Sequence, residues 1–229
     1  MWSASPTSSS GYAWRMPDLT PYLLPRSLRK RPGVLVLPGG GYGMHVAHEG
    51  EPYAKWLNEQ GFNAWVLRYK LGIWPVPFDD AVEALAIARQ TPGVDPRRVG
   101  VMGASAGGHL AGALATMADP AFAILCFPVI LMGPGGHAGS QKNLCGTDEA
   151  LAASLSLEKR VDRSTCPTFL WHTREDDAVP AQNSLQFAAA LEANGIEHEL
   201  HVFQKGRHGI KLTSGHPWVA CLANWLKDR

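Results

Sequence analysis

The chain has 229 residues, a formal net charge of +1 and a hydrophobic content of 45%. This length suits one α/β domain with a substantial core and leaves little room for two domains. The near-neutral charge gives no electrostatic basis for binding nucleic acid or an anionic membrane surface. No apolar run approaches the roughly 18 residues that a membrane span needs, so we expect neither nucleic acid nor a membrane as a partner.

Residues 1–25 are rich in Ser and Pro and show no hydrophobic period, which predicts an irregular N-terminal arm. Residues 1–11 lack the apolar core of a secretory signal peptide. The cysteines at positions 126, 145, 166 and 221 are scattered and form no C-x-x-C pair. Reduced, mostly buried thiols explain this pattern, and together the two features predict a cytoplasmic protein.

Between residues 26 and 229, short apolar runs alternate with segments of helical period. The apolar runs predict strands over residues 34–37, 63–68, 99–102, 122–127, 168–171 and 197–203. Helical spacing predicts helices over residues 51–59, 78–88, from 109 onward, 182–194 and 218–226. Strands separated by helices require crossover connections, which give a mostly parallel sheet with helices on both faces. Ligands bind such sheets at the carboxyl ends of the strands.

The long segment over residues 129–167 shows no clear element and contains Gly133-Pro-Gly-Gly136. An irregular stretch of this length inside a compact domain is usually functional. It is too short to form a second domain, so we expect it to be a partial cover over the site.

The sequence Gly103-Ala-Ser-Ala-Gly107 lies between a predicted strand and a predicted helix. A G-x-S-x-G motif in this context is typical of a nucleophile elbow, a sharp turn that lifts Ser105 Oγ clear of the sheet. Glycines at both ends let the strand and the helix approach closely. A chance Gly/Ser turn is the alternative, and the flanks on both sides favour the elbow.

A serine nucleophile needs a base and an acid that orients the base, and after such an elbow they follow in the order acid, then histidine. His208 lies in a glycine-flanked loop after the last predicted strand, so we expect it to be the general base. Glu175, Asp176 and Asp177 follow the strand at residues 168–171, and spacing alone does not choose among them. We take Asp176 as the acid of the triad.

Acyl transfer also needs hydrogen-bond donors for the oxyanion. The backbone N–H of Ala106, directly after the nucleophile, supplies one. The second is expected from the loop Pro38-Gly-Gly-Gly-Tyr42, where Gly40 and Gly41 are the candidates. A phosphate-binding loop is the alternative, but the segment lacks the Lys-Ser/Thr ending of a Walker motif and any G-x-G-x-x-G.

This chemistry requires no metal and no organic cofactor. The pairs His45/His48 and His198/His201 lack an H-E-x-x-H frame or a supporting cysteine, which favours solvated or structural histidines over a metal site. Trp74 lies near a predicted strand end and is the candidate substrate contact, against the alternative of simple packing.

Motifs spread over residues 37–212 carry a resemblance to a known family. They are Leu37-Pro-Gly-Gly-Gly-Tyr42, Leu67-Arg-Tyr-Lys-Leu-Gly72, Pro77-Phe-Asp-Asp-Ala81, Gly103-Ala-Ser-Ala-Gly-Gly-His-Leu110, His137-Ala-Gly-Ser140, residues 172–180 and Gly206-Arg-His-Gly209. Through them the chain resembles the acetyl-xylan-esterase-like serine esterases of the α/β-hydrolase fold, some of them named xylanases. That family is related to the hormone-sensitive-lipase group.

The resemblance implies a single-domain α/β-hydrolase fold and hydrolysis of short acyl esters, typically O-acetyl groups on sugars. It also places the acid at Asp176, in the family's Asp-x-x-Val-Pro motif that here ends at Pro180. This sequence differs from the family pattern at two places where substrate is expected to bind. Cys126-Phe127 stands where the family often has tyrosine, and Gly72-Ile-Trp-Pro75 differs from the common pattern.

We therefore expect a serine carboxylesterase that releases short acyl groups, above all acetyl, from small acetylated saccharides through an acyl-enzyme on Ser105. A generic short-chain carboxylesterase and a peptidase- or lipase-like hydrolase are alternatives on the same scaffold. A non-catalytic ligand-binding protein is an alternative of another class. The intact set of Ser105, Asp176 and His208 argues against it.

Overall fold

The structure is a computed structural model and describes residues 16–229. A seven-stranded sheet forms its centre. The strands are β1 (Leu19–Tyr22), β2 (Arg31–Leu37), β3 (Asn63–Leu67), β4 (Val94–Ala104), β5 (Ala123–Cys126), β6 (Thr168–Thr173) and β7 (His198–Phe203). Their order is β1-β3-β2-β4-β5-β6-β7. From β3 to β7 every neighbouring pair is parallel, and β1 runs antiparallel to β3 at one edge. The predicted, mostly parallel sheet is confirmed.

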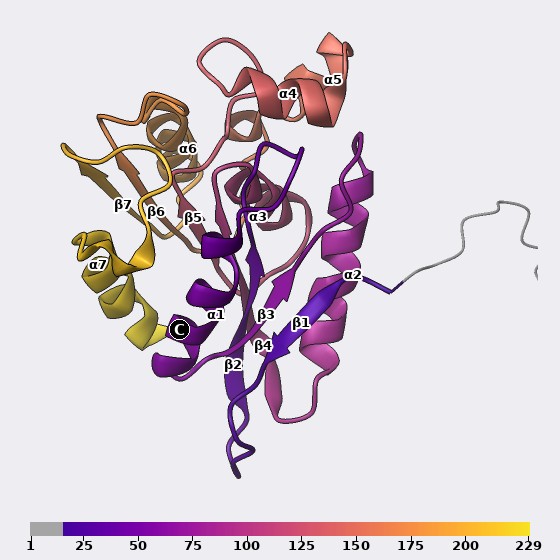
Figure 1. Ribbon diagram of the computed structural model, residues 1–229, viewed down its shortest axis with the longest axis vertical. Coiled ribbons are helices and arrows are strands. Elements are labelled where there is room, and N and C mark those ends of the chain that lie inside the picture. Colours follow the sequence, from indigo (N-terminus) through magenta and orange to yellow (C-terminus); the bar gives the residue numbers. More distant parts are fainter. Residues whose placement is uncertain (1–15) are drawn as a thin grey trace, which may run out of the picture.

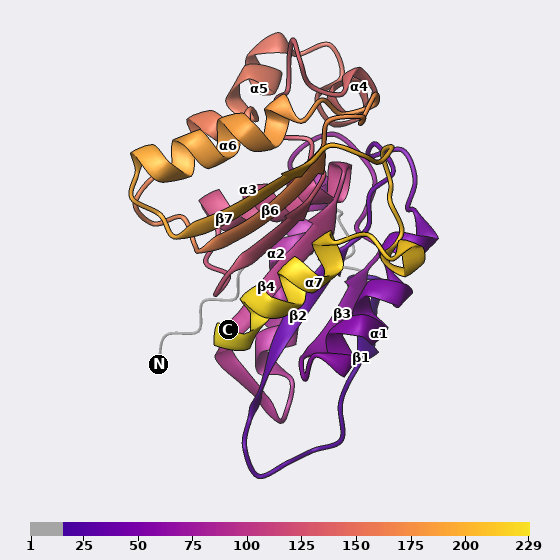
Figure 2. The same cartoon turned by 90° about the vertical axis from the view of Figure 1, so that its left-hand side faces the viewer.

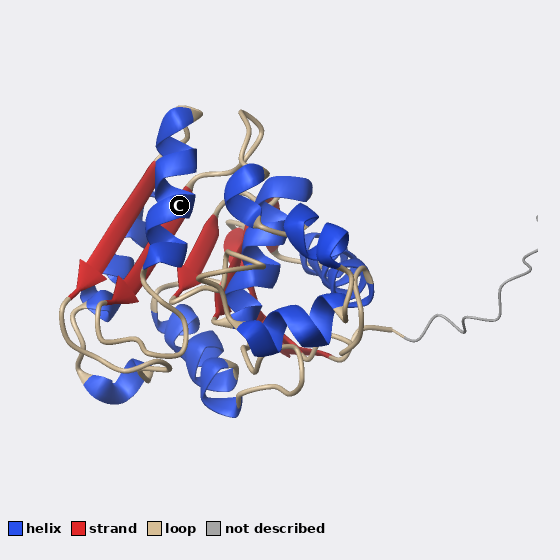
Figure 3. Ribbon diagram, turned by 90° about the horizontal axis from the view of Figure 1, so that it is seen from above, coloured by secondary structure: helices blue, strands red, loops and turns tan. Residues whose placement is uncertain are grey.

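Helices cover both faces of the sheet, as Figures 2 and 3 show. One face packs against α2 (Val76–Gln90), α3 (Ala106–Met117) and α6 (Gln182–Ala193), and the other against α1 (Glu51–Glu59) and α7 (Trp218–Trp225). Successive strand residues point to opposite faces. In β2, Leu35 and Leu37 therefore join the first core, whereas Val34 and Val36 join the second. Burial on both faces explains why the central strands read as continuous apolar runs.

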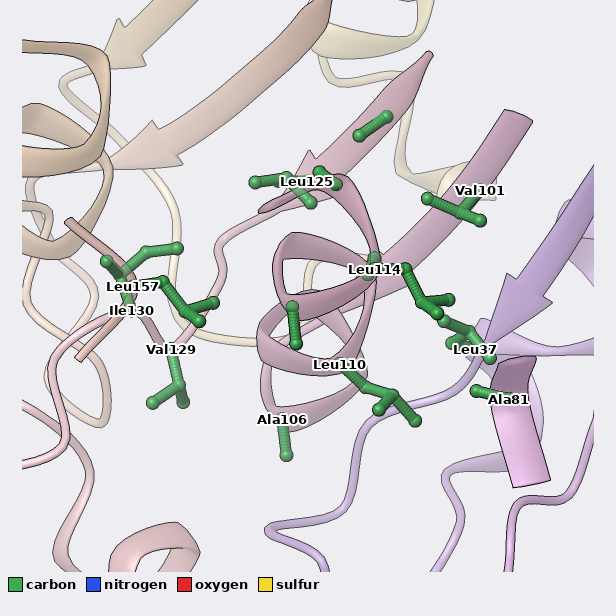
Figure 4. Packing of buried hydrophobic residues seen from close by; sticks show 14 of the residues in the cluster. Leu37, Ala81, Val101, Ala106, Leu110, Leu114, Leu125, Val129, Ile130 and Leu157 are labelled. Carbon is green, nitrogen blue, oxygen red and sulfur yellow. The ribbon is translucent and has the colours of Figure 1, made fainter. Parts of the chain in front are cut away.

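The hydrophobic core anchors α3, the helix that follows the elbow. Figure 4 shows Leu110 and Leu114 directed toward residues of the sheet, among them Leu37 and Val101, and all of these side chains are fully buried. Burying a leucine side chain stabilises a fold by about 2 kcal/mol. The first turn of α3, and with it the backbone around the elbow, is therefore held against the sheet by the core.

The strand order of the sheet has a topological switch point between β2 and β4. After β2 the chain places β3 on one side, and it then returns to place β4 on the other side of β2. The loops that leave the carboxyl ends of β2 and β4 consequently start next to each other and lead away from each other. A crevice at such a point is the usual ligand site in open α/β sheets.

Residues 19–22 do not belong to an irregular arm, because they form β1 and pair with β3 over the register Leu19↔Leu67 to Tyr22↔Ala64. The predicted arm is wrong for this part, and residues 1–15 lie outside the described residues. An edge strand bonds on one side only, so it tolerates Pro21 and shows no buried period. Its sequence therefore carried no strand signal.

Residues 129–167 are also more regular than predicted. They contain α4 (Ala138–Cys145), α5 (Glu149–Ser154) and a 3-10 turn over Leu157–Lys159. These helices are too short to show a hydrophobic period and are started by side-chain caps: His137 accepts from Ser140 N–H, and Asp148 from Leu151 N–H. Figure 1 shows α4 and α5 side by side at the end of the molecule toward which the parallel strands point. In the part of the chain that the structure describes, no helix combines the length and apolarity needed to cross a membrane.

Candidate active site

Ser105 occupies the turn between β4 and α3. Its φ of 53° and ψ of −119° lie in a region that residues with a side chain rarely adopt. The turn is tied to the next strand, because Ser105 N–H donates to the Cys126 carbonyl and the Ser105 carbonyl accepts from Val129 N–H, both at 3.0 Å. Such strain, held in place by its surroundings, is typical of a functional turn.

The two motif glycines are required by close backbone contacts. A Cβ atom at Gly103 would lie 2.0 Å from the carbonyl oxygen of Gly107, and one at Gly107 would lie 2.0 Å from the carbonyl oxygen of Leu37. Both obstacles are backbone atoms, so they cannot rotate away. The elbow geometry predicted from the motif is what the structure shows.

A chain of two hydrogen bonds links Ser105 to His208 and Asp176. His208 Nδ1–H donates to Asp176 Oδ2 at 2.7 Å, and this bond leaves Nε2 as the acceptor for Ser105 Oγ–H at 2.9 Å. The three side chains come from the loops after β4, β6 and β7. The structure thus brings together the three residues predicted as the triad, in the arrangement of nucleophile, base and orienting acid.

Asp176 is held ionised by its neighbours. Burial alone raises the pKa of this carboxyl, but hydrogen bonds from His172, His208 and the Val179 N–H outweigh it and hold the pKa well below its ordinary value. His172 is itself fully buried; its Nε2 lies 2.8 Å from the Val179 carbonyl and 3.3 Å from Asp176 Oδ2. His172 therefore orients the carboxylate that orients His208.

The acidic residues on either side of Asp176 do not contact His208. Glu175 is exposed and pairs with Lys205 Nζ at 2.6 Å, and Asp177 is exposed. Asp176 is the carboxylate of the three that contacts His208, and this contact resolves the choice that spacing left open.

A pocket of about 280 Å³ lies beside Ser105 and His208, and its lining includes Gly40 and Gly41. These glycines have φ values of 125° and 64°, which favour residues without a side chain. Ala106 is the first residue of α3, so its N–H has no partner within the helix. The structure thus places the predicted donors Gly40 and Gly41 in the pocket lining, and the third, Ala106, directly follows the pocket residue Ser105.

Glu49 also lines this pocket, and sequence reasoning missed it. Its side chain is 3% exposed, and Oε2 accepts a hydrogen bond from Gly39 N–H at 2.8 Å. Burial raises the pKa of Glu49 to about 7, although the Gly39 N–H and nearby His208 each lower it. No motif marks this position, and a glutamate before the Pro-containing start of a helix is ordinary. Only the fold shows that it underlies the glycine loop.

Trp74 is not among the residues that line the pocket. Its ring packs on Phe78 with the centroids 4.8 Å apart, and its backbone N–H donates to the Leu144 carbonyl at 2.9 Å. Phe127 is also buried, with its ring 4.9 Å from that of His208. The departure at Phe127 therefore affects the packing of the base and not a substrate contact. Among residues 16–229, no three His, Cys, Asp or Glu side chains are grouped to hold a metal ion.

Comparison with known proteins identifies the family of the chain. A family model described as alpha/beta hydrolase fold matches residues 34–152, which include both the glycine loop and the elbow. The chain belongs to the alpha/beta hydrolase family. A second model, the prolyl oligopeptidase family, matches residues 138–229, which carry Asp176 and His208. The fold predicted by the resemblance is confirmed.

Two relatives of this alpha/beta hydrolase are similar to it over most of its length. It is 38% identical over 226 residues to endo-1,4-beta-xylanase B of Butyrivibrio fibrisolvens and 33% identical over 216 residues to an acetylxylan esterase of Xylanibacter ruminicola. These matches cover 87% and 85% of this chain but 35% and 45% of the relatives, so the chain spans less than half the length of either.

A solved structure extends the likeness over nearly the whole chain. It is described as an acetyl ester-xyloside bifunctional hydrolase from Caldicellulosiruptor lactoaceticus, is 39% identical, and superimposes with a TM-score of 0.89 over 93% of this chain and 88% of its own. An alpha/beta hydrolase from a deep-sea metagenome library is 30% identical, with a TM-score of 0.78.

Proposed function

We propose that this alpha/beta hydrolase is a serine carboxylesterase that removes short acyl groups, above all acetyl, from small acetylated saccharides. The observation that carries the proposal is the hydrogen-bonded chain from Ser105 through His208 to Asp176, set beside a pocket lined by Gly40 and Gly41. A nucleophile, a base and an adjacent set of backbone donors are the parts that acyl transfer needs.

In the first half of the reaction, His208 Nε2 takes the proton of Ser105 as Oγ attacks the ester carbonyl carbon. The N–H groups of Ala106 and of Gly40 or Gly41 stabilise the oxyanion. When the tetrahedral intermediate collapses, the carbon–oxygen bond to the alcohol breaks and His208 gives its proton to the leaving oxygen. Asp176, ionised by its hydrogen bonds, stabilises the imidazolium form of His208 throughout.

In the second half, water replaces the alcohol. His208 takes a proton from the water as it attacks the acyl carbon, and the bond to Ser105 Oγ breaks with return of the proton to the serine. The products are a free carboxylic acid and the unchanged enzyme. Every proton is carried by His208, so no metal or organic cofactor enters the scheme.

The substrate class is supported by the similarity to an acetylxylan esterase and to an acetyl ester-xyloside hydrolase, and by the similarity to a xylanase. We also propose a reducing compartment such as the cytoplasm, which is supported by four free cysteines of which Cys126, Cys145 and Cys166 are buried.

The test compares wild type with Ser105→Ala on p-nitrophenyl esters from acetate to decanoate and on acetylated xylo-oligosaccharides. We expect activity that peaks at acetate, extends to the saccharides and falls by at least about 10⁴-fold in Ser105→Ala, with unchanged circular dichroism. Activity confined to long acyl chains would remove the saccharide proposal. Absence of serine-dependent turnover would favour a binding protein. Cleavage of a prolyl p-nitroanilide would favour the peptidase alternative that the match over residues 138–229 raises.

A further inference from the structure

His137 lines the pocket beside Ser105 and His208, yet the scheme above gives it no task. It stands at the start of α4, where its Nδ1 accepts a hydrogen bond from the Ser140 N–H at 3.0 Å and lies 2.8 Å from Ser140 Oγ. A backbone N–H can only donate, so Nδ1 carries no proton. In the neutral ring the proton must then be on Nε2, which makes that atom a hydrogen-bond donor.

The ring stays neutral for a second reason. Burial lowers the pKa of His137, and nearby His208 lowers it further, whereas Asp176 acts weakly in the opposite direction. Among residues 16–229, no acceptor is hydrogen-bonded to His137 Nε2. The half-buried ring therefore offers the pocket a fixed, neutral donor that the protein itself does not use.

Helix α4 holds this donor against the glycine loop. Asn143 Nδ2 donates to the Gly41 carbonyl at 2.9 Å, and a Cβ atom on Gly41 would lie 3.6 Å from His137 Cε1. At the next residue of the same turn, the Leu144 carbonyl accepts a hydrogen bond from the backbone N–H of Trp74 at 2.9 Å. These two bonds hold the last turn of α4, and through it the helix that begins at His137, beside the proposed oxyanion donors.

We propose that His137 Nε2–H donates a hydrogen bond to a hydroxyl or ether oxygen of the leaving alcohol, and so selects polyhydroxylated alcohols over apolar ones. The alcohol departs on the side of His208, because His208 returns the proton to it. His137 and His208 line the same pocket. This assignment rests on the proposed esterase function and specifies how that site recognises a sugar.

The variant that tests the assignment is His137→Asn. Asparagine is a good N-cap whose side-chain oxygen accepts from the third helical N–H, so the start of α4 is kept while the ring donor is removed. The readout is kcat/KM for acetylated xylo-oligosaccharide and for p-nitrophenyl acetate, since both release acetate but only the first has a hydroxylated alcohol. This parameter covers acylation, the step in which the alcohol leaves.

The matched control is His48→Asn. His48 lines the same pocket, but its Nε2 atom is buried and lies 3.8 Å from Glu49 Oε1, so it presents no exposed donor to the pocket. We expect His137→Asn to lower kcat/KM for the saccharide by about five- to tenfold, the value of one neutral hydrogen bond, with at most about a twofold change for p-nitrophenyl acetate. His48→Asn should change the two substrates by the same factor.

Two results for His137→Asn would overturn the assignment: an unchanged saccharide rate, or an equal loss on both esters. The failure of the proposed function is a separate outcome, in which wild type hydrolyses p-nitrophenyl acetate but no acetylated saccharide. In that case the substrate class and the role of His137 both fail.

Discussion

The Gly39 amide donates a hydrogen bond to Glu49 Oε2 at 2.8 Å, although the Glu49 side chain is only 3% exposed and lies beside the triad. This contact fixes the start of the glycine loop to a carboxyl group. Burial raises the pKa of that carboxyl from 4.5 to about 7, so the folded protein holds its proton more tightly than the unfolded chain does. Its contribution to stability is present below pH 4.5 and is lost as the pH rises through about 7.

Glu49→Gln should remove this pH dependence, because glutamine keeps a carbonyl oxygen for Gly39 and does not ionise. As the pH rises from 5 to 8, the unfolding free energy of the variant minus that of wild type should increase by up to about 3 kcal/mol. Urea unfolding at several pH values measures the difference. A difference that stays constant over this range would contradict the raised pKa.

Asp176→Asn should lower kcat by about 10³- to 10⁴-fold, because the amide no longer stabilises the His208 imidazolium or enforces its tautomer. Asp177→Asn is the matched control: the same change one residue away, at an exposed position without contact to His208. It should leave kcat within about twofold. Steady-state kinetics with p-nitrophenyl acetate decides, and the reverse ranking would refute the role given to Asp176.

Gly103→Ala should destabilise the fold by about 3 kcal/mol, since the new Cβ atom would overlap the Gly107 carbonyl oxygen. Gly133→Ala makes the same chemical change where nothing lies within 4 Å of the added atom, and we expect a change within about 0.5 kcal/mol. The melting temperatures of the two variants give the comparison. Equal stability would mean that the elbow backbone is less closely packed than described.

Treatment with EDTA should leave kcat/KM for p-nitrophenyl acetate unchanged, because His208 activates the nucleophile and the water in the proposed scheme. Residues 16–229 group no three metal-binding side chains. A loss of activity that added zinc restores would contradict a metal-free mechanism.

Much of the fold was predictable because the central strands and their covering helices bury apolar side chains at a regular period. The triad was predictable because its members follow three strands whose carboxyl ends meet at one edge. Asp176 could be chosen over Glu175 only through the resemblance or the structure, since the deciding contact to His208 spans 32 positions of the chain.

Other parts had no such signal. Strand β1 contains Pro21 and pairs on one side only, so neither period nor propensity marks it. Glu49 reaches the site because the loop after β2 folds back over the start of α1, a tertiary event that no short motif encodes. For Trp74, a place near a predicted strand end does not fix where the side chain packs: its ring lies against Phe78, outside the pocket lining, and a contact to substrate stays a prediction.

The dispersion of the triad over the sheet has a consequence for biosynthesis. Ser105 is in place once β4 and α3 have formed, whereas His208 follows β7, the outermost strand on its side of the sheet. Because 103 positions separate Ser105 from His208, a nascent chain contains the nucleophile before it contains the base that activates it. In the proposed mechanism ester hydrolysis needs His208 in place, so its onset cannot precede the docking of β7 and a chromogenic assay gives a latest time for that step.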